Sequence, residues 1–319
     1  MRNGLVVFFI ALFGLALAQF GLGFMDVSPG MLMPATLLIT AVFIAVPVFA
    51  IYKAASHPWT SKLAIVFVVI GVVIHFTLYL AWKQGLVGSG SFALAVTSLS
   101  QVGFFLWCMG LGVLVATLLK DKNLIIPVSL FLAAYDVFLV LTPMGITKKI
   151  MQAAPEVLPA IGYKIPSIGN VAPYAIIGPA DFLFMGMFFV SIYRFKMKSK
   201  ETLLWLIPAI LVYLLLSMFV KALPLLVPIG LTVLIVNWKE FNMNKEERNS
   251  TIGLFVVLAL VLGGLFAWSK SRPPAAPAEP SPTEPAQAAP EPGGSLGQGV
   301  EDRGPSQGQS APGSTPNPP

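Results

Sequence analysis

Two carboxylates lie where the chain is otherwise apolar, and they are the residues best placed to do chemistry. All other acidic residues fall in expected connections, at expected helix ends or in the C-terminal tail, which leaves Asp136 and Asp181 inside apolar runs. A carboxylate at the centre of a bilayer costs about 2.5 to 3.5 kcal/mol, so such residues normally face a bundle interior and have a function. We therefore treat Asp136 and Asp181 as the candidate catalytic pair.

The two aspartates are expected at comparable depths on neighbouring antiparallel helices. Asp136 precedes the end of its apolar run by about five residues, and Asp181 follows the start of the next run by about ten. At about 1.5 Å of rise per residue, they would lie about 8 and about 15 Å below the same surface. Their side chains could then meet across the interface between the two helices.

Paired carboxylates can carry out peptide hydrolysis without a metal or a cofactor. Two carboxylates within hydrogen-bonding distance cannot easily both ionise, so they share a proton. The ionised group can take a proton from water while the protonated group polarises a peptide carbonyl. The pair predicts an aspartic endopeptidase.

Few other side chains could take part in this chemistry. His57 falls in a connection, and His75 is expected to be a packed or hydrogen-bonded histidine within an apolar run. Cys108 is the single cysteine, which excludes an internal disulfide and a cysteine-cluster metal site. Neither a serine nor a cysteine triad is supported, and we expect no metal.

The aspartates must be positioned by membrane-spanning helices. Of 319 residues, 56% are hydrophobic and 11% charged, and the mean hydropathy is +0.81, which excludes a soluble globular fold. A span needs about 20 mostly apolar residues. Nine runs qualify, which predicts an all-α polytopic membrane protein with about nine transmembrane helices: 5–25, 31–52, 63–82, 92–119, 124–141, 171–193, 203–220, 222–238 and 252–268.

Two of these runs have a second interpretation. The first, with Arg2 before it and Ala16-Leu17-Ala18 within it, also resembles a cleavable signal peptide, although its length favours a retained span. The run 92–119 is long for one helix and short for two. We divide the chain into N-terminal helices at 1–120, a catalytic core at 121–240, an extra C-terminal helix at 241–272 and a disordered Pro-rich tail at 273–319.

The basic residues indicate an orientation rather than a nucleic-acid partner. The formal net charge is +6, but the lysines and arginines lie in short connections, as the positive-inside rule describes. Helices that alternate from a cytoplasmic N-terminus collect most of them on the cytoplasmic side, including the cluster 194–200. We therefore expect a cytoplasmic N-terminus and a lipid bilayer as the environment.

The aspartates lie within motifs whose order is specific. Tyr135-Asp136 is followed by Gly178-Pro179-Ala180-Asp181 and then by Lys221-Ala222-Leu223-Pro224. In this order the sequence resembles the presenilin and signal peptide peptidase family of intramembrane aspartyl proteases. That family carries Y-D on one helix, G-x-G-D on the next and P-A-L near the start of a later one. The resemblance covers about residues 127–237.

The resemblance implies a presenilin-like catalytic bundle and a role for each matched residue. Asp136 and Asp181 are the implied catalytic pair, and Tyr135, Gly178, Pro179 and Ala180 the implied site-shaping residues. Lys221, Pro224, Leu225 and Leu226 are implied to contact substrate. By the same analogy we expect transmembrane proteins as substrates, no cofactor, no obligatory subunit and a prokaryotic plasma membrane.

Three departures from the family pattern leave alternatives open. Ala180 replaces the second glycine of G-x-G-D, Pro224-Leu225-Leu226 replaces P-A-L, and four spans instead of five precede the Y-D helix. A catalytically inactive member that binds membrane helices is therefore one alternative. A proton- or cation-coupled transporter is another, because intramembrane aspartates also serve as relays.

Overall fold

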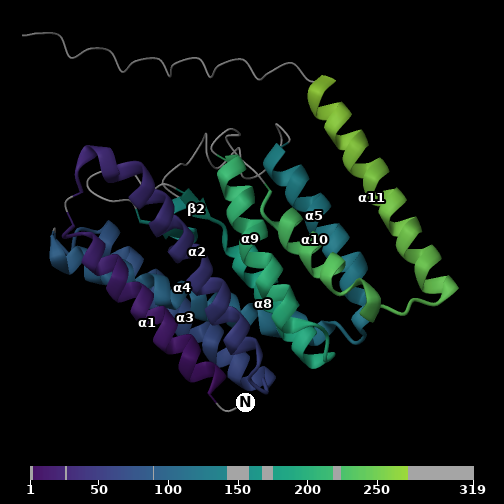
Figure 1. Cartoon of the computed structure of the whole chain (residues 1–319), viewed down its shortest axis with the longest axis horizontal. Helices are drawn as coiled ribbons and strands as arrows, with labels where there is room; N and C mark the ends of the chain where they lie inside the picture. The colour runs from purple at the N-terminus through teal and green to yellow at the C-terminus, as the bar shows by residue number, and fades with distance from the viewer. Residues whose placement is uncertain are drawn as a thin grey trace, which may run out of the picture. The chain divides into compact units, whose positions relative to one another are not determined.

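The computed structural model describes residues 3–25, 27–88, 90–141, 158–166, 175–217 and 224–271, all within the unit Met1–Arg272. Its α-helices are α1 (Gly4–Leu22), α2 (Leu32–Ala55), α3 (Ser61–Lys83), α4 (Ser91–Leu118), α5 (Ile125–Leu141), α7 (Leu158–Ile161), α8 (Pro179–Arg194), α9 (Ser199–Ser217), α10 (Leu226–Val236) and α11 (Lys245–Ser271). Strands β1 (Tyr163–Ile165) and β2 (Ala175–Ile177) form an antiparallel pair, and short 3-10 turns cover Pro29–Met31, Lys122–Leu124 and Trp238–Glu240 (Figure 1).

Seven helices of the described chain are long and apolar enough to cross a bilayer, so this is a multi-pass integral membrane protein. The run 92–119 forms one helix, α4. The expected spans 171–193 and 222–238 are shorter as helices, because α8 has 16 residues and α10 has 11. Both helices begin after the expected start of the span: β2 precedes α8, and non-helical Pro224 and Leu225 precede α10. The expected tail 273–319 lies outside the described residues.

Helix α4 lies at the centre of the packing. It is mostly buried and contacts α1, α3 and α8. Two of its glycines allow close approaches: a Cβ at Gly110 would lie 2.7 Å from the carbonyl oxygen of Ala64, and one at Gly112 would lie 2.5 Å from that of Leu183. Small residues at such crossings let membrane helices pack backbone to backbone.

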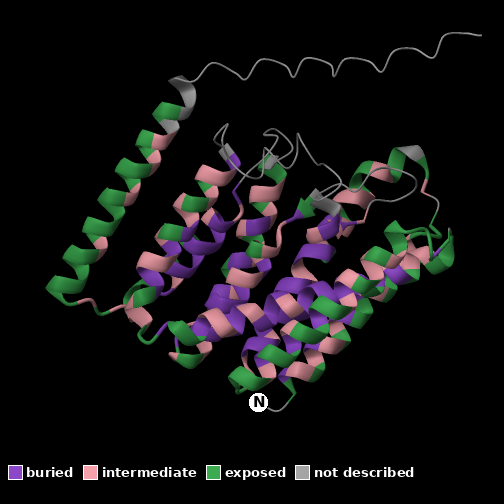
Figure 2. Ribbon diagram, turned by 180° about the vertical axis from the view of Figure 1, so that it is seen from behind, coloured by how far each residue is buried: buried purple, intermediate pink, exposed green. Residues whose placement is uncertain are grey.

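Helix α11, unlike α4, lies on the outside of the bundle with most of its apolar side chains exposed. It contacts α5, yet none of its apolar stretch is buried (Figures 1 and 2). Its start is held by polar bonds, because the side chain of Asn123 donates to the carbonyl of Asn242 and to the carboxylate of Glu247. The buried core includes residues of α1, α2, α4, α8, α9 and α10, for example Phe8 and Phe189.

Candidate active site

The start of α8 positions Asp181. Gly178 is the N-cap residue with an extended backbone, Pro179 takes the first helical position, and Asp181 is the third helical residue. Proline suits that position, because its missing N–H would have no helical partner there. The carboxylate of Asp181 accepts a hydrogen bond from the backbone N–H of Gly178, as the third residue of a capping box does. The Gly-Pro-Ala-Asp sequence is thus a helix start that fixes a carboxylate.

Asp136 accepts a hydrogen bond from the start of a different helix, α10. It lies on α5, and its Oδ2 accepts the backbone N–H of Leu226 at 2.8 Å. Leu226 is the first residue of α10, so this N–H is one of the donors that a helix start leaves without an intrahelical partner. Asp136 therefore links α5 to α10 across a long stretch of sequence.

The two aspartates lie within electrostatic range of each other. Asp136 and Asp181 lie close enough for their charges to repel each other. Each carboxylate receives one backbone N–H, and a carboxylate offers about four lone-pair positions. Lone pairs therefore remain on both groups for further hydrogen bonds. The close pairing of the two aspartates stays a prediction, and Asp181 lies at the start of its helix rather than ten residues into it.

Two residues near the pair escaped the sequence analysis. Cys108 of α4 donates weakly from Sγ to the carbonyl of Pro179 at 3.7 Å and interacts electrostatically with Asp181. Tyr213 of α9 interacts electrostatically with Asp136. Cys108 is notable in the sequence only as the single cysteine, and Tyr213 does not stand out in its apolar run, so no sequence signal places either residue beside the aspartates.

An aromatic cluster holds the start of α8. Phe182, which follows Asp181, packs its ring 4.9 Å from Phe105, 5.8 Å from Phe104 and 5.4 Å from Tyr163. All four side chains are buried. The cluster joins α4, β1 and α8, so it restricts the position of the backbone that carries Asp181.

Tyr163 also joins the β-hairpin to α2. Its hydroxyl donates to the carbonyl of Phe43 at 3.0 Å. In a regular helix that carbonyl would accept the N–H four residues later, but the residue there is Pro47, which has none. Tyr163 therefore satisfies a carbonyl that a proline inside α2 leaves free.

The β1–β2 hairpin leads directly to the start of α8, which carries Asp181. β1 pairs antiparallel with β2, with Tyr163 opposite Ile177, and Gly178 follows β2 at once. The sequence analysis did not predict these strands, because they have three residues each and lie in runs assigned to an apolar span or to the connection 142–170. Most of that connection lies outside the described residues.

The remaining predicted site residues differ in how far they are buried and in whether they lie near the aspartates. Pro224 and Leu226 are buried, and Leu225 is half-buried, at the start of α10 beside Asp136. Tyr135 is 41% exposed and stacks on Phe131 at 5.8 Å, so its ring lies on an exposed face of α5. Ala180 is exposed, and Gly178 and Pro179 are half-buried. Lys221 lies outside the described residues.

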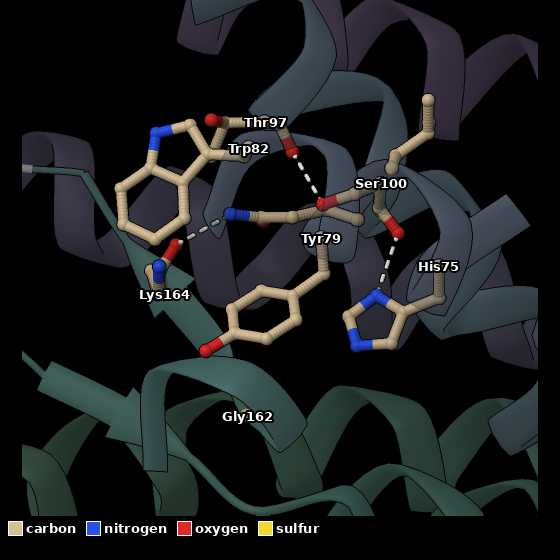
Figure 3. A pocket seen from close by; sticks show the side chains of 9 residues that line it. His75, Tyr79, Trp82, Thr97, Ser100, Gly162 and Lys164 are labelled. Atoms are coloured by element: carbon tan, nitrogen blue, oxygen red, sulfur yellow. Dashed lines mark hydrogen bonds between the residues drawn. The ribbon is translucent and has the colours of Figure 1, made fainter. Parts of the chain in front are cut away.

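A second polar site surrounds His75, between α3, α4 and β1 (Figure 3). The ring nitrogens of His75 lie 2.9 Å from the carbonyl of Ser100 and 3.0 Å from that of Ala160. The expectation of a hydrogen-bonded histidine is confirmed. Lys164 places its ammonium 5.3 Å from the centre of the Trp82 ring. Over the described parts of the chain, no group of three or more His, Cys, Asp or Glu side chains could hold a metal ion.

No protein-family model, curated protein or solved structure matches this chain. The functional argument therefore depends on the residues and their geometry.

Proposed function

We propose that the protein is an intramembrane aspartyl endopeptidase that hydrolyses peptide bonds in transmembrane segments of other proteins. The observation that carries this proposal is that Asp136 and Asp181 interact electrostatically and that each accepts a backbone N–H at the start of a helix. Fixed polar groups in a site of low dielectric need little reorganisation during reaction. The motif order, which resembles that of the presenilin and signal peptide peptidase family, supports the same activity.

The reaction follows from one shared proton. The ionised carboxylate takes a proton from water, and the water oxygen bonds to the scissile carbonyl carbon while the protonated carboxyl group donates to the carbonyl oxygen. The carbon–nitrogen bond then breaks as the leaving amine takes up a proton. The products are a carboxylic acid and an amine, and neither a metal nor a cofactor is needed.

The hairpin offers a means of presenting substrate. A transmembrane substrate must unwind before cleavage, because helical hydrogen bonds shield its carbonyls. β2 is paired only with β1 in the described sheet, and it leads into Gly178 and Asp181. A substrate strand added to the other edge of β2 would gain backbone hydrogen bonds and pass beside the aspartates. Leu225, at the start of α10, would contact its side chains.

The remaining features of the proposal concern the membrane context. We assign nine crossings in a presenilin-like bundle, with short α8 and α10 each completed by non-helical backbone. Such backbone is tolerated at depth where protein or a cavity surrounds it. The N-terminus is cytoplasmic in a prokaryotic plasma membrane, and no further subunit is required.

The test is cleavage of a labelled single-span helical substrate by detergent-purified protein. We expect cleavage by the wild type and none by Asp136→Asn or Asp181→Asn. Asp121→Asn is the matched control: Asp121 caps the 3-10 turn before α5 by accepting the N–H of Asn123, and asparagine can cap as well. Absence of cleavage by folded wild-type protein, together with proton flux that Asp136→Asn abolishes, would instead identify a transporter.

A further inference from the structure

A groove between two lysines opens at the end of α10. It has a volume of about 390 Å³ and is lined by Lys198, Ile235, Val236, Trp238 and Lys239. Lys198 lies just before α9, whereas Lys239 follows α10. Neither ammonium group has an ion-pair partner among the residues that the structure describes. Two cations therefore flank a groove that is otherwise apolar.

A buried asparagine builds this groove. Asn237 is fully buried, and its Oδ1 accepts the backbone N–H of Lys198 at 2.9 Å. Its Nδ2 donates to the hydroxyl of Thr202 at 2.9 Å and to the carbonyl of Val233 at 3.0 Å. These bonds fix the end of α10 to the start of α9, so the spacing of the two lysine backbones is set by the fold.

The groove lies where a membrane surface is expected. It is formed where α10 ends and α9 begins, next to the basic cluster 194–200. Trp238 is 68% exposed and Ile235 is 71% exposed. Tryptophan prefers the headgroup level of a bilayer, and an exposed isoleucine one turn deeper contacts acyl chains. The groove thus presents cations toward the headgroups and apolar side chains toward the hydrocarbon.

We propose that this groove binds one acidic phospholipid, with its phosphate between Lys198 and Lys239 and an acyl chain along Ile235 and Trp238. Basic pockets between membrane helices on the cytoplasmic side bind anionic headgroups in this way. Lys198 follows α8, which carries Asp181 at its start, and Lys239 follows α10, whose first N–H binds Asp136, so the bound phosphate joins the far ends of these two helices. The inference does not depend on proteolytic activity.

The test measures lipid retention by native mass spectrometry, with purified protein in a neutral detergent and added phosphatidylglycerol or phosphatidylcholine. We expect the wild type to retain phosphatidylglycerol preferentially. Lys198→Gln and Lys239→Gln should each weaken this binding about fivefold, and the double variant about 25-fold, since each lysine near an anionic headgroup contributes about that factor. Lys200→Gln is the matched control, because it removes the same charge from the same cluster outside the groove.

Three results would overturn the proposal. These are equal retention of both lipids, an equal loss of binding in Lys200→Gln, and displacement of the lipid by inorganic phosphate at the same concentration. The last would mean that the site takes a free anion rather than a lipid. Thermal unfolding checks that the variants fold. Lys198→Gln is expected to fold, because Asn237 binds only the backbone N–H of Lys198. If Lys198→Gln nevertheless fails to fold, lipid binding by Lys239→Gln decides the question.

Discussion

The bond between Tyr163 and Phe43 gives a prediction that can be worked out in detail. Replacing Tyr163 by phenylalanine keeps the buried ring and removes only the hydroxyl that donates to the Phe43 carbonyl. Pro47 cannot supply the missing N–H, so that carbonyl would be left without a partner inside the bundle. We expect Tyr163→Phe to destabilise the folded protein.

The expected size follows from the burial of the carbonyl. An unsatisfied buried polar group costs about 1 to 3 kcal/mol, and hydrogen bonds between membrane helices contribute about 0.6 to 2 kcal/mol. We therefore expect a loss of about 1 to 2 kcal/mol. In a Pro47→Ala background the N–H of residue 47 can reach the Phe43 carbonyl, so removal of the hydroxyl should cost about 0.5 kcal/mol there.

A double-mutant cycle measures this difference. The four proteins, wild type, Tyr163→Phe, Pro47→Ala and the double variant, would be unfolded reversibly by sodium dodecyl sulfate in mixed micelles. A coupling free energy of about 1 kcal/mol supports the assignment. The reasoning is refuted if Tyr163→Phe costs the same in both backgrounds, since the hydroxyl would then not be replacing the donor that Pro47 lacks.

Two further predictions concern the packing around α4 and α8. Phe182→Ala removes a buried ring together with its three ring contacts and leaves a cavity, so it should destabilise the protein by about 3 to 5 kcal/mol in the same unfolding assay. Phe255→Ala, on exposed α11, should change little, and equal losses would argue against the cluster. Arg194→Gln should lower stability by about 1 kcal/mol, because Arg194 donates to the carbonyls of Ala116 and Leu119 at the end of α4; Lys200→Gln, with the same charge change, should have no such effect.

Much of the helical framework could be predicted from sequence, because the thickness of the bilayer sets the number of apolar residues that a spanning helix needs. Asp136 and Asp181 stood out for the same reason, since a carboxylate in such a run is costly. The start of α8 was misplaced by the apolar residues of β2, which look like the beginning of a span. Pro179 was the signal that could have corrected it, because proline favours the first position of a helix.

Contacts between distant segments could not be predicted in this way. The N–H of Leu226 reaches Asp136, and the hydroxyl of Tyr163 reaches Phe43, across stretches that carry no shared pattern. Pro47 indicated that one carbonyl of α2 would lack its usual partner, but nothing in the sequence named the donor. Such pairings are decided by tertiary packing, which hydropathy and spacing do not encode.

The two aspartates also act as helix caps, and this ties chemistry to local folding. A carboxyl group that takes up a proton becomes a weaker acceptor, so protonation of Asp136 during turnover would loosen the start of α10 at Leu226. By reciprocity, anything that holds the start of α10 in place would oppose that protonation. A bound substrate strand that holds the start of α10 would thus tune the acidity of a carboxyl group that moves protons during its own cleavage, through the Leu226 N–H, which the strand need not touch.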